Sequence, residues 1–239
     1  MEWQAEGTVI ARRAHGETAV IIEVMTVEFG RHAGLVPGGA SQKRAALVQP
    51  GNRLSLRWRA RLDEQLGTFA AEPARARPGL IADPLALAGL NAVCALLVFA
   101  LAERDPHPGL ALASEALLDR MEAGADWAED YLRWEMLLLD EMGFGLDLGD
   151  CAVTGAQDGL AYVSPRSGRA VSRAGAGDWA DRLLPLPAIL GGAGDNRGRG
   201  IAEGLAITGH FLDARLARDL VGKPLPAARG RLVRRLARG

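Results

Sequence analysis

Residues 53–62 read RLSLRWRARL, and this alternating stretch decides the fold of the first part of the chain. Leu54, Leu56 and Trp58, then alanine and leucine, stand at its even positions, whereas arginine or serine occupies every odd one. Because the side chains of a β-strand point alternately to opposite faces, the pattern predicts a strand with one apolar face and one face of four arginines. We expect the apolar face to pack on a hydrophobic core.

Four more strands are expected within the first 72 residues. The runs 7–12 and 18–25 are rich in β-branched residues, and His15-Gly16 between them favours a turn. The runs 29–36 and 65–71 complete the set. Five short strands in about 70 residues, with no helix between them, fit a small antiparallel barrel such as an OB-fold.

Helices predominate after a proline-bracketed connector at 72–78. Asp83 followed by Pro84 is typical of a helix N-cap with proline at the first helical position. The apolar run 85–102 that follows has 18 residues, the threshold length for a membrane span. Its Asn91, its many alanines and the lack of flanking aromatic residues favour a buried helix instead.

Four later helices complete the expected fold. They are predicted at 108–124, at 127–143 with Asp126 and Glu129 as a capping box, at 178–184 and at 201–221. Short strands at 160–163 and 169–171 predict a hairpin. We therefore expect an α+β protein with an OB-fold nucleic-acid-binding domain at 1–79 and a helical domain at 80–239. The helical domain contains an insert at about 150–176 and ends in a basic tail.

The formal net charge of −1 is an average over segments of opposite sign. Residues 1–79 carry 11 basic and 8 acidic side chains, residues 80–150 carry 3 and 14, and residues 195–239 carry 10 and 4. No acidic residue lies between Glu28 and Asp63. Such asymmetry indicates charged partners rather than a particular fold.

Composition and motifs exclude several classes of protein. Two cysteines, Cys94 and Cys151, cannot form a disulfide framework or a four-cysteine zinc site. The chain has no GxGxxG, GxxxxGK[ST], GxSxG or HExxH motif, and its four histidines have no evident acid–base partner. We expect no catalytic residue, no cofactor and no metal. The start MEWQAEG lacks the basic and apolar regions of a signal peptide, so a cytoplasmic protein without membrane attachment is expected.

The acid-free basic stretch is the strongest functional signal. A row of cations on one small barrel suits a groove that follows a phosphate backbone, with binding that weakens as salt rises. The predicted DNA-binding residues are Arg31, Lys43, Arg44, Arg53, Arg57, Arg59 and Arg61. Cations of the tail are candidates for contact with DNA or with an acidic partner peptide; these are Lys223, Arg229, Arg231, Arg234 and Arg235. A merely solvated strand face, an RNA-binding module and a protein-interaction scaffold remain alternatives. Trp58 is expected to point inward.

Six segments in order resemble the bacterial RecO family of recombination mediators. These are GTVIARRAHGETAVIIEVMT, FGRHAGLVPGGASQKR, LVQPGNRLSLRWRARLDEQLGTF, YLRWEMLLLDEMGFGLDL, CAVTGAQDGLAYVSPRSGRAV and GKPLPAARGRLVRRL. The resemblance covers most of the chain. It implies an N-terminal OB domain, a helical domain with a zinc-ribbon-like insert, and a non-enzymatic, nucleoid-associated role. It also implies binding of single- and double-stranded DNA, strand annealing, and work with RecR to load RecA. Docking of the C-terminal tail of single-strand-binding protein is implied as well.

The zinc site of some family members is missing in this chain. Two CxxC pairs would supply four thiolates for a tetrahedral zinc ion. Here Cys151 stands at the first position, but Thr154, Ser172 and Gly175 stand at the other three. One thiol cannot hold structural zinc, so we expect a hairpin insert without zinc ligands, held by packing.

Overall fold

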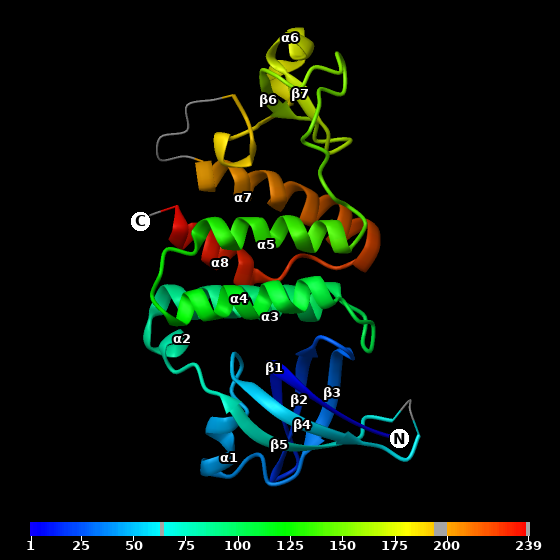
Figure 1. The fold of residues 1–239 in the computed structure, drawn as a ribbon, viewed down its shortest axis with the longest axis vertical. Helices are drawn as coiled ribbons and strands as arrows, with labels where there is room; N and C mark the ends of the chain where they lie inside the picture. Colours follow the sequence, from blue (N-terminus) through cyan, green and yellow to red (C-terminus); the bar gives the residue numbers. More distant parts are fainter. Residues whose placement is uncertain (63–64, 194–199, 238–239) are drawn as a thin grey trace. The chain divides into compact units, whose positions relative to one another are not determined.

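Five strands at the start of the chain close into a barrel. The computed structural model describes residues 1–62, 65–193 and 200–237. The strands follow one another around the barrel in the order β1-β2-β3-β5-β4 (Figure 1), with β3 and β5 parallel and the other pairs antiparallel. This order is typical of an OB-fold, and the predicted α+β fold is confirmed. The bounds are β1 Glu2–His15, β2 Ala19–Thr26, β3 Gly30–Val36, β4 Arg53–Arg59 and β5 Thr68–Arg75.

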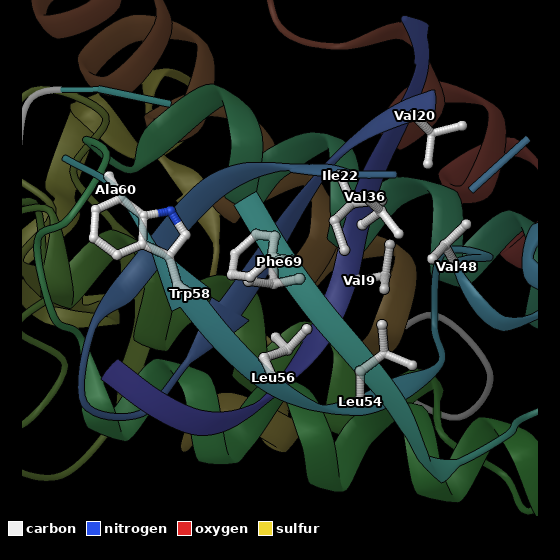
Figure 2. Packing of buried hydrophobic residues seen from close by; sticks show 11 residues of the cluster. Val9, Val20, Ile22, Val36, Val48, Leu54, Leu56, Trp58, Ala60 and Phe69 are labelled. Carbon is white, nitrogen blue, oxygen red and sulfur yellow. The ribbon is translucent and has the colours of Figure 1, made fainter. Parts of the chain in front are cut away.

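The alternation of β4 builds the barrel core as the sequence predicts. Leu54, Leu56 and Trp58 are at most 2% exposed and point into the barrel, whereas the residues that alternate with them, Arg53, Ser55, Arg57 and Arg59, point outward. Figure 2 shows Trp58 at one end of this core and Val48 near the other. The strand ends at Arg59, before the predicted end. The Ala60 N–H still donates to the Met1 carbonyl, but the chain then turns away from the sheet. Leu62 is therefore 61% exposed.

One helix in the barrel was not predicted. Helix α1 (Gln42–Leu47) lies between β3 and β4, and the Asn52 amide donates to the carbonyls of Ala46 and Leu47. Its six residues are too few to show a helical repeat in the sequence. Val48 follows the helix and is fully buried in the barrel core.

Chain contacts divide the protein into two compact units. The first comprises residues 1–126 and 226–232, and the second residues 127–225 and 233–239. The first unit thus adds helices α2 (Gly79–Ala82), α3 (Pro84–Ala100) and α4 (Pro108–Glu122) to the barrel. The division into an OB domain at 1–79 and a helical domain at 80–239 remains a prediction.

Helix α3 is the buried helix expected from its composition. The Asp83 carboxylate caps it by accepting from the N–H groups of Leu85 and Ala86. Eight of its residues are buried. None of the helices in the described ranges is both long and apolar enough to cross a membrane.

Helix α5 (Ala128–Glu141) packs against α7 (Gly200–Phe211) in the second unit. The stripe of Tyr131, Trp134 and Leu138 is buried, and the Thr208 hydroxyl donates to the buried Glu135 carboxylate at 2.6 Å. The predicted capping box is wrong, because Trp127 occupies the N-cap and makes no side-chain cap. A π-helical segment, η3 (Leu212–Val221), continues α7 through the range predicted as one helix.

The insert is a three-stranded sheet in the order β7-β6-β8. Strands β6 (Leu160–Val163) and β7 (Ala170–Ser172) form the predicted hairpin, and β8 (Leu184–Pro185) adds a strand that was not predicted. Short helices follow β7 and β8 in the chain: α6 (Arg173–Ala176), η1 (Gly177–Arg182) and η2 (Ala188–Leu190).

The basic tail is a helix, α8 (Ala227–Leu236). Leu232 is fully buried and Arg229 is only 8% exposed, so one side of this helix is part of the packed structure. Its sequence, AARGRLVRR, places apolar residues between the arginines at helical spacing.

Candidate nucleic-acid interface

Strand β4 presents a row of arginines to solvent. The side chains of Arg53, Arg57 and Arg59 are 40%, 56% and 72% exposed. They share one face because their positions differ by even numbers, and each step of two residues advances about 7 Å along a strand. The structure therefore brings three of the predicted DNA-binding residues together on one strand. Arg61 follows the strand and is exposed.

Two glutamates of β1 face this row, which the sequence analysis missed. Antiparallel pairing sets Glu2 opposite Arg59 and Glu6 opposite Ser55. Glu2 pairs with Arg59 at 2.9 Å and with Arg57 at 3.6 Å, and Glu6 pairs with Arg53 at 2.8 Å. The hydrogen bond from Arg59 lowers the pKa of Glu2. The stretch without acids is thus balanced in part by acids from the neighbouring strand, which a count along the sequence cannot reveal.

These ion pairs are exposed, and they leave the row able to bind other anions. Pairs between solvent-exposed side chains contribute little to stability, because water competes with each partner. A phosphate group near β4 therefore replaces a weak partner of the arginine rather than a strong one. Charge-assisted bonds from guanidinium to phosphate are among the stronger polar contacts in proteins.

Two of the other predicted barrel cations, Arg31 and Arg44, do not join the row. Arg31 lies on β3 with its side chain 14% exposed, pairs with Glu23 at 2.8 Å and donates to the Val98 carbonyl. Arg44 lies on α1 and donates to the Pro37 carbonyl. The side chain of Lys43 lies outside the described part of the structure.

The predicted tail cations fall into two groups. Lys223, which precedes α8, and Arg231, Arg234 and Arg235 on that helix are exposed. Arg229 is buried, so this residue is not available to DNA or to a partner peptide without rearrangement of the helix.

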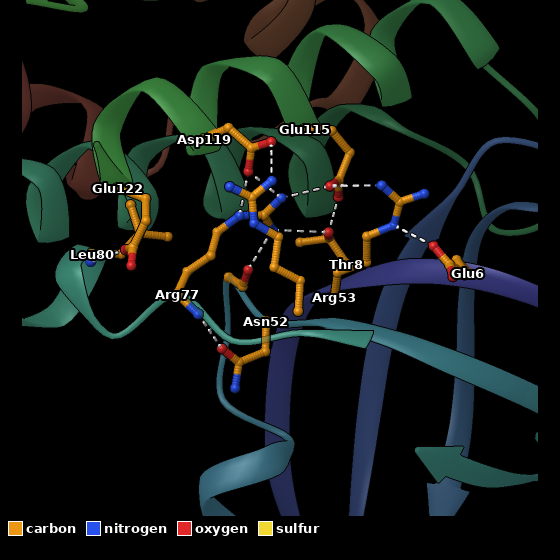
Figure 3. Close-up of polar contacts among 11 residues, drawn as sticks. Glu6, Thr8, Asn52, Arg53, Arg77, Leu80, Glu115, Asp119 and Glu122 are labelled. Carbon is orange, nitrogen blue, oxygen red and sulfur yellow. Dashed lines mark hydrogen bonds and ion pairs between the residues drawn. The ribbon is translucent and has the colours of Figure 1, made fainter. Parts of the chain in front are cut away.

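A buried arginine cluster beside the row was also missed by the sequence analysis. Arg77, in the predicted connector, has a fully buried side chain that donates to Glu115 at 2.6 Å and to Asp119 at 2.8 Å (Figure 3). It also donates to the Gly51 carbonyl at 2.7 Å. Burial lowers the pKa of Arg77, but the two carboxylates outweigh this effect and raise it. Glu115 further contacts Thr8 of β1 and Arg53 of β4, so the cluster anchors the arginine row to α4.

Hydrogen bonds converge on one thiol, Cys151, in the insert. The Cys151 sulfur accepts from the Ser172 N–H at 3.2 Å, the Ser172 hydroxyl at 3.3 Å and the Thr154 N–H at 3.5 Å. A Cβ at Gly175 would lie 2.9 Å from this sulfur, so the four positions that the resemblance equates with the zinc ligands of some family members converge. This donor set, with one thiol, does not fit zinc. Among the described residues no three His, Cys, Asp or Glu side chains gather in a way that could hold a metal.

The Cys151 cluster predicts a pH-dependent stability. Burial raises the pKa of Cys151, but hydrogen bonds from Ser172 and Thr154 outweigh it and lower the pKa from 9.0 to about 6. A group whose pKa is lower in the folded state than in the unfolded state stabilises the folded protein. This contribution is complete at pH values above the unfolded-state pKa, and it is lost as the pH falls through the folded-state pKa. Urea unfolding measures the free energy of unfolding of the native protein and of Cys151→Ala. The difference between the two values should therefore grow from pH 6 to pH 9.

Cys94 supplies the matched control for this measurement. It is a second buried thiol, whose pKa burial raises to about 12. Cys94→Ala should lower stability by the same amount at pH 6 and pH 8, because the thiol stays protonated in both states over that range. A chelator should leave both unfolding curves unchanged. Parallel pH profiles for the two variants would contradict the assignment of a thiolate at Cys151.

Barrel and arginine row together define a class of protein. A closed five-stranded barrel of this strand order, with adjacent exposed arginines on β4, is the architecture of an OB-fold protein with a cationic outer face.

Comparisons with known proteins give the family. Residues 1–77 match the family model for the N terminal of recombination protein O, and residues 81–224 match the model for its C terminal. A DNA repair protein RecO from Paracoccus denitrificans is 69% identical over 236 residues, covering 99% of this chain and 96% of that protein. One from Cereibacter sphaeroides is 57% identical over the full length of both chains. One from Roseobacter denitrificans is 56% identical, covering 100% of this chain and 99% of that protein. The chain belongs to the recombination protein O (RecO) family, as the resemblance predicted.

Proposed function

We propose that this protein is a non-enzymatic mediator of recombinational DNA repair that binds single- and double-stranded DNA and anneals complementary single strands. The repair role is supported by membership of a family whose curated relatives carry the name DNA repair protein. Its proposed partners are RecR, the C-terminal tail of single-strand-binding protein and, indirectly, RecA. Its proposed location is the cytoplasm, in association with the nucleoid.

The observation that carries the proposal is the exposed row of Arg53, Arg57 and Arg59 on β4. Annealing brings two polyanions together, and their repulsion opposes the approach. Cations that neutralise phosphates lower that barrier and release condensed counterions, so binding depends strongly on salt. Because base edges need not be contacted, such binding is largely independent of sequence.

Glu2 acts in this proposal as an internal competitor of the phosphate. It pairs with both Arg57 and Arg59, so DNA must displace it to reach them. Glu2→Gln is expected to raise the affinity for single-stranded DNA about two- to fivefold at low salt, in line with the loss of weak surface pairs. Fluorescence anisotropy with a labelled oligonucleotide measures this change.

Glu17→Gln is the control for the effect of net charge. It adds the same charge to the barrel at an exposed turn residue for which the described residues offer no ion-pair partner. Equal gains in the two variants would show that Glu2 does not compete with DNA and that only net charge matters.

A strand-annealing assay across a salt series, with and without single-strand-binding protein, tests the proposal. We expect the protein to accelerate pairing of complementary strands at low salt, without nucleotide hydrolysis, and to lose this effect as salt rises. Competition by RNA of matched sequence separates the RNA-binding alternative. Absence of both DNA binding and annealing at low salt would favour a protein-interaction scaffold and would reject the proposal.

A further inference from the structure

An aromatic cavity opens at the Trp58 end of the barrel, and phosphate binding by the arginine row does not require it. The cavity has a volume of about 490 Å³ and lies entirely within the first compact unit. Trp3, Phe29, His32 and Trp58 line it. Trp3 comes from β1, Phe29 from the turn between β2 and β3, and Trp58 from β4, so the closure of the barrel assembles the site.

The rings of the cavity form a stack that a further flat ring can extend. Phe29 and Trp3 are stacked, with centroids 4.4 Å apart and planes 13° from parallel. Trp3 and Trp58 are 6.0 Å apart and 18° from parallel, and His32 meets both tryptophans edge-on. Trp58 is 1% exposed and forms the floor, whereas Trp3 and Phe29 are half-buried and accessible. Offset stacking on such faces is favourable for any planar π-system.

Polar groups at the cavity match the edges of a nucleobase. The Trp3 Nε1–H is buried and meets no acceptor among the described residues. The carboxylates of Glu2 and Glu28 line the cavity and can accept from the amino or ring imino N–H groups of a base. The Arg104 guanidinium lies over Trp58, 5.5 Å from the ring centroid, and its donation to the Gln65 carbonyl at 2.8 Å fixes its position.

The cavity is continuous with the arginine row. Glu2 lines the cavity and also pairs with Arg57 and Arg59, so the mouth of the cavity borders the outward face of β4. A polyanion on this face therefore passes the cavity. A neutral base fits the interior better than an acidic peptide side chain, because Glu2 and Glu28 would repel a carboxylate there.

We propose that this cavity takes one unstacked base of a single strand whose phosphates lie on Arg57 and Arg59. The inference rests on the proposed DNA-binding function and assigns it a base-holding site. Base-paired DNA has no free base to offer, so the site acts only on single strands. Stacking is tolerant of sequence, because every base has a flat π face.

The test compares three probes bound by the full chain at low salt. They are an oligothymidylate of about 12 nucleotides, within the 4–16 that one OB-fold covers, a backbone of the same length made of abasic residues, and a matched duplex. The native protein should bind the oligothymidylate more tightly than the abasic backbone. Phe29→Leu, which removes the accessible ring and keeps an apolar side chain, should weaken oligothymidylate binding about fivefold or more, the lower range for stacking of one base. Its affinities for the abasic backbone and the duplex should not change.

Trp179→Leu is the matched control, because Trp179 is an aromatic residue 61% exposed in the second unit. It should leave all three affinities unchanged. Equal binding of the thymidylate and abasic probes by the native protein, or an unchanged thymidylate affinity in Phe29→Leu, would overturn the inference and leave phosphate binding intact. Failure of the native protein to bind any of the three probes would instead overturn the proposed function.

Discussion

Arg77→Ala is expected to lower the free energy of unfolding by about 3–5 kcal/mol, the usual cost of removing one partner from a buried ion pair. The Arg77 side chain is fully buried, and its loss leaves Glu115, Asp119 and the Gly51 carbonyl without their shared donor. Urea unfolding followed by circular dichroism measures the change. The cluster joins two barrel strands to α4. The unfolding transition of the whole barrel should therefore move to lower urea concentration.

Arg75→Ala is the matched control for this prediction. Arg75 pairs with the same Asp119, at 2.5 Å, but its side chain is 50% exposed. Its replacement should cost less than about 1 kcal/mol, as for surface pairs in general. A similar cost for both variants would mean that burial of Arg77 does not determine the strength of the cluster.

The double charge reversal Arg57→Glu and Arg59→Glu is expected to abolish most single-stranded DNA binding. It removes two exposed cations from the row and places two more carboxylates beside Glu2. At low salt we expect a loss of at least about a hundredfold, because both the released counterions and the direct contacts disappear. Anisotropy titration measures the affinity, and an unchanged thermal unfolding curve shows that the outward-facing substitutions leave the barrel folded.

The control is Arg133→Glu with Arg218→Glu. These arginines are 64% and 73% exposed and also form surface ion pairs, but they belong to the second unit. The formal charge change is the same in both double variants. Equal losses of affinity would point to net charge alone and would remove the assignment of the interface to β4.

The sequence predicts best where one residue pattern determines one structural choice. Alternation at 53–59 predicts both the barrel strand and the direction of Trp58, because period two leaves each side chain only one face. Asp83-Pro84 predicts the start of α3, because the cap is a local interaction. The Cys151 and Ser172 positions of the missing zinc site meet as the family resemblance implies.

What could not be predicted depends on pairing between distant segments. Glu2 and Arg59 are far apart in the sequence, and only the register of β1 on β4 makes them partners. Arg77 resembles any connector arginine until α4 brings Glu115 and Asp119 to it. The aromatic cavity likewise depends on three separate segments, which contribute Trp3, Phe29 and Trp58. The inward direction of Trp58 alone therefore does not predict a cavity at that end of the barrel.

The most direct test of the central claim is the salt dependence of single-stranded DNA binding with the neutral variant Arg57→Gln, Arg59→Gln. Each phosphate neutralised contributes about 0.7 to the slope of log affinity against log salt concentration for a single strand. If both arginines contact phosphates, the slope of this variant should be smaller than that of the native protein by about 1.4. A slope equal to that of the native protein would contradict the claim that the outward face of β4 holds the DNA backbone.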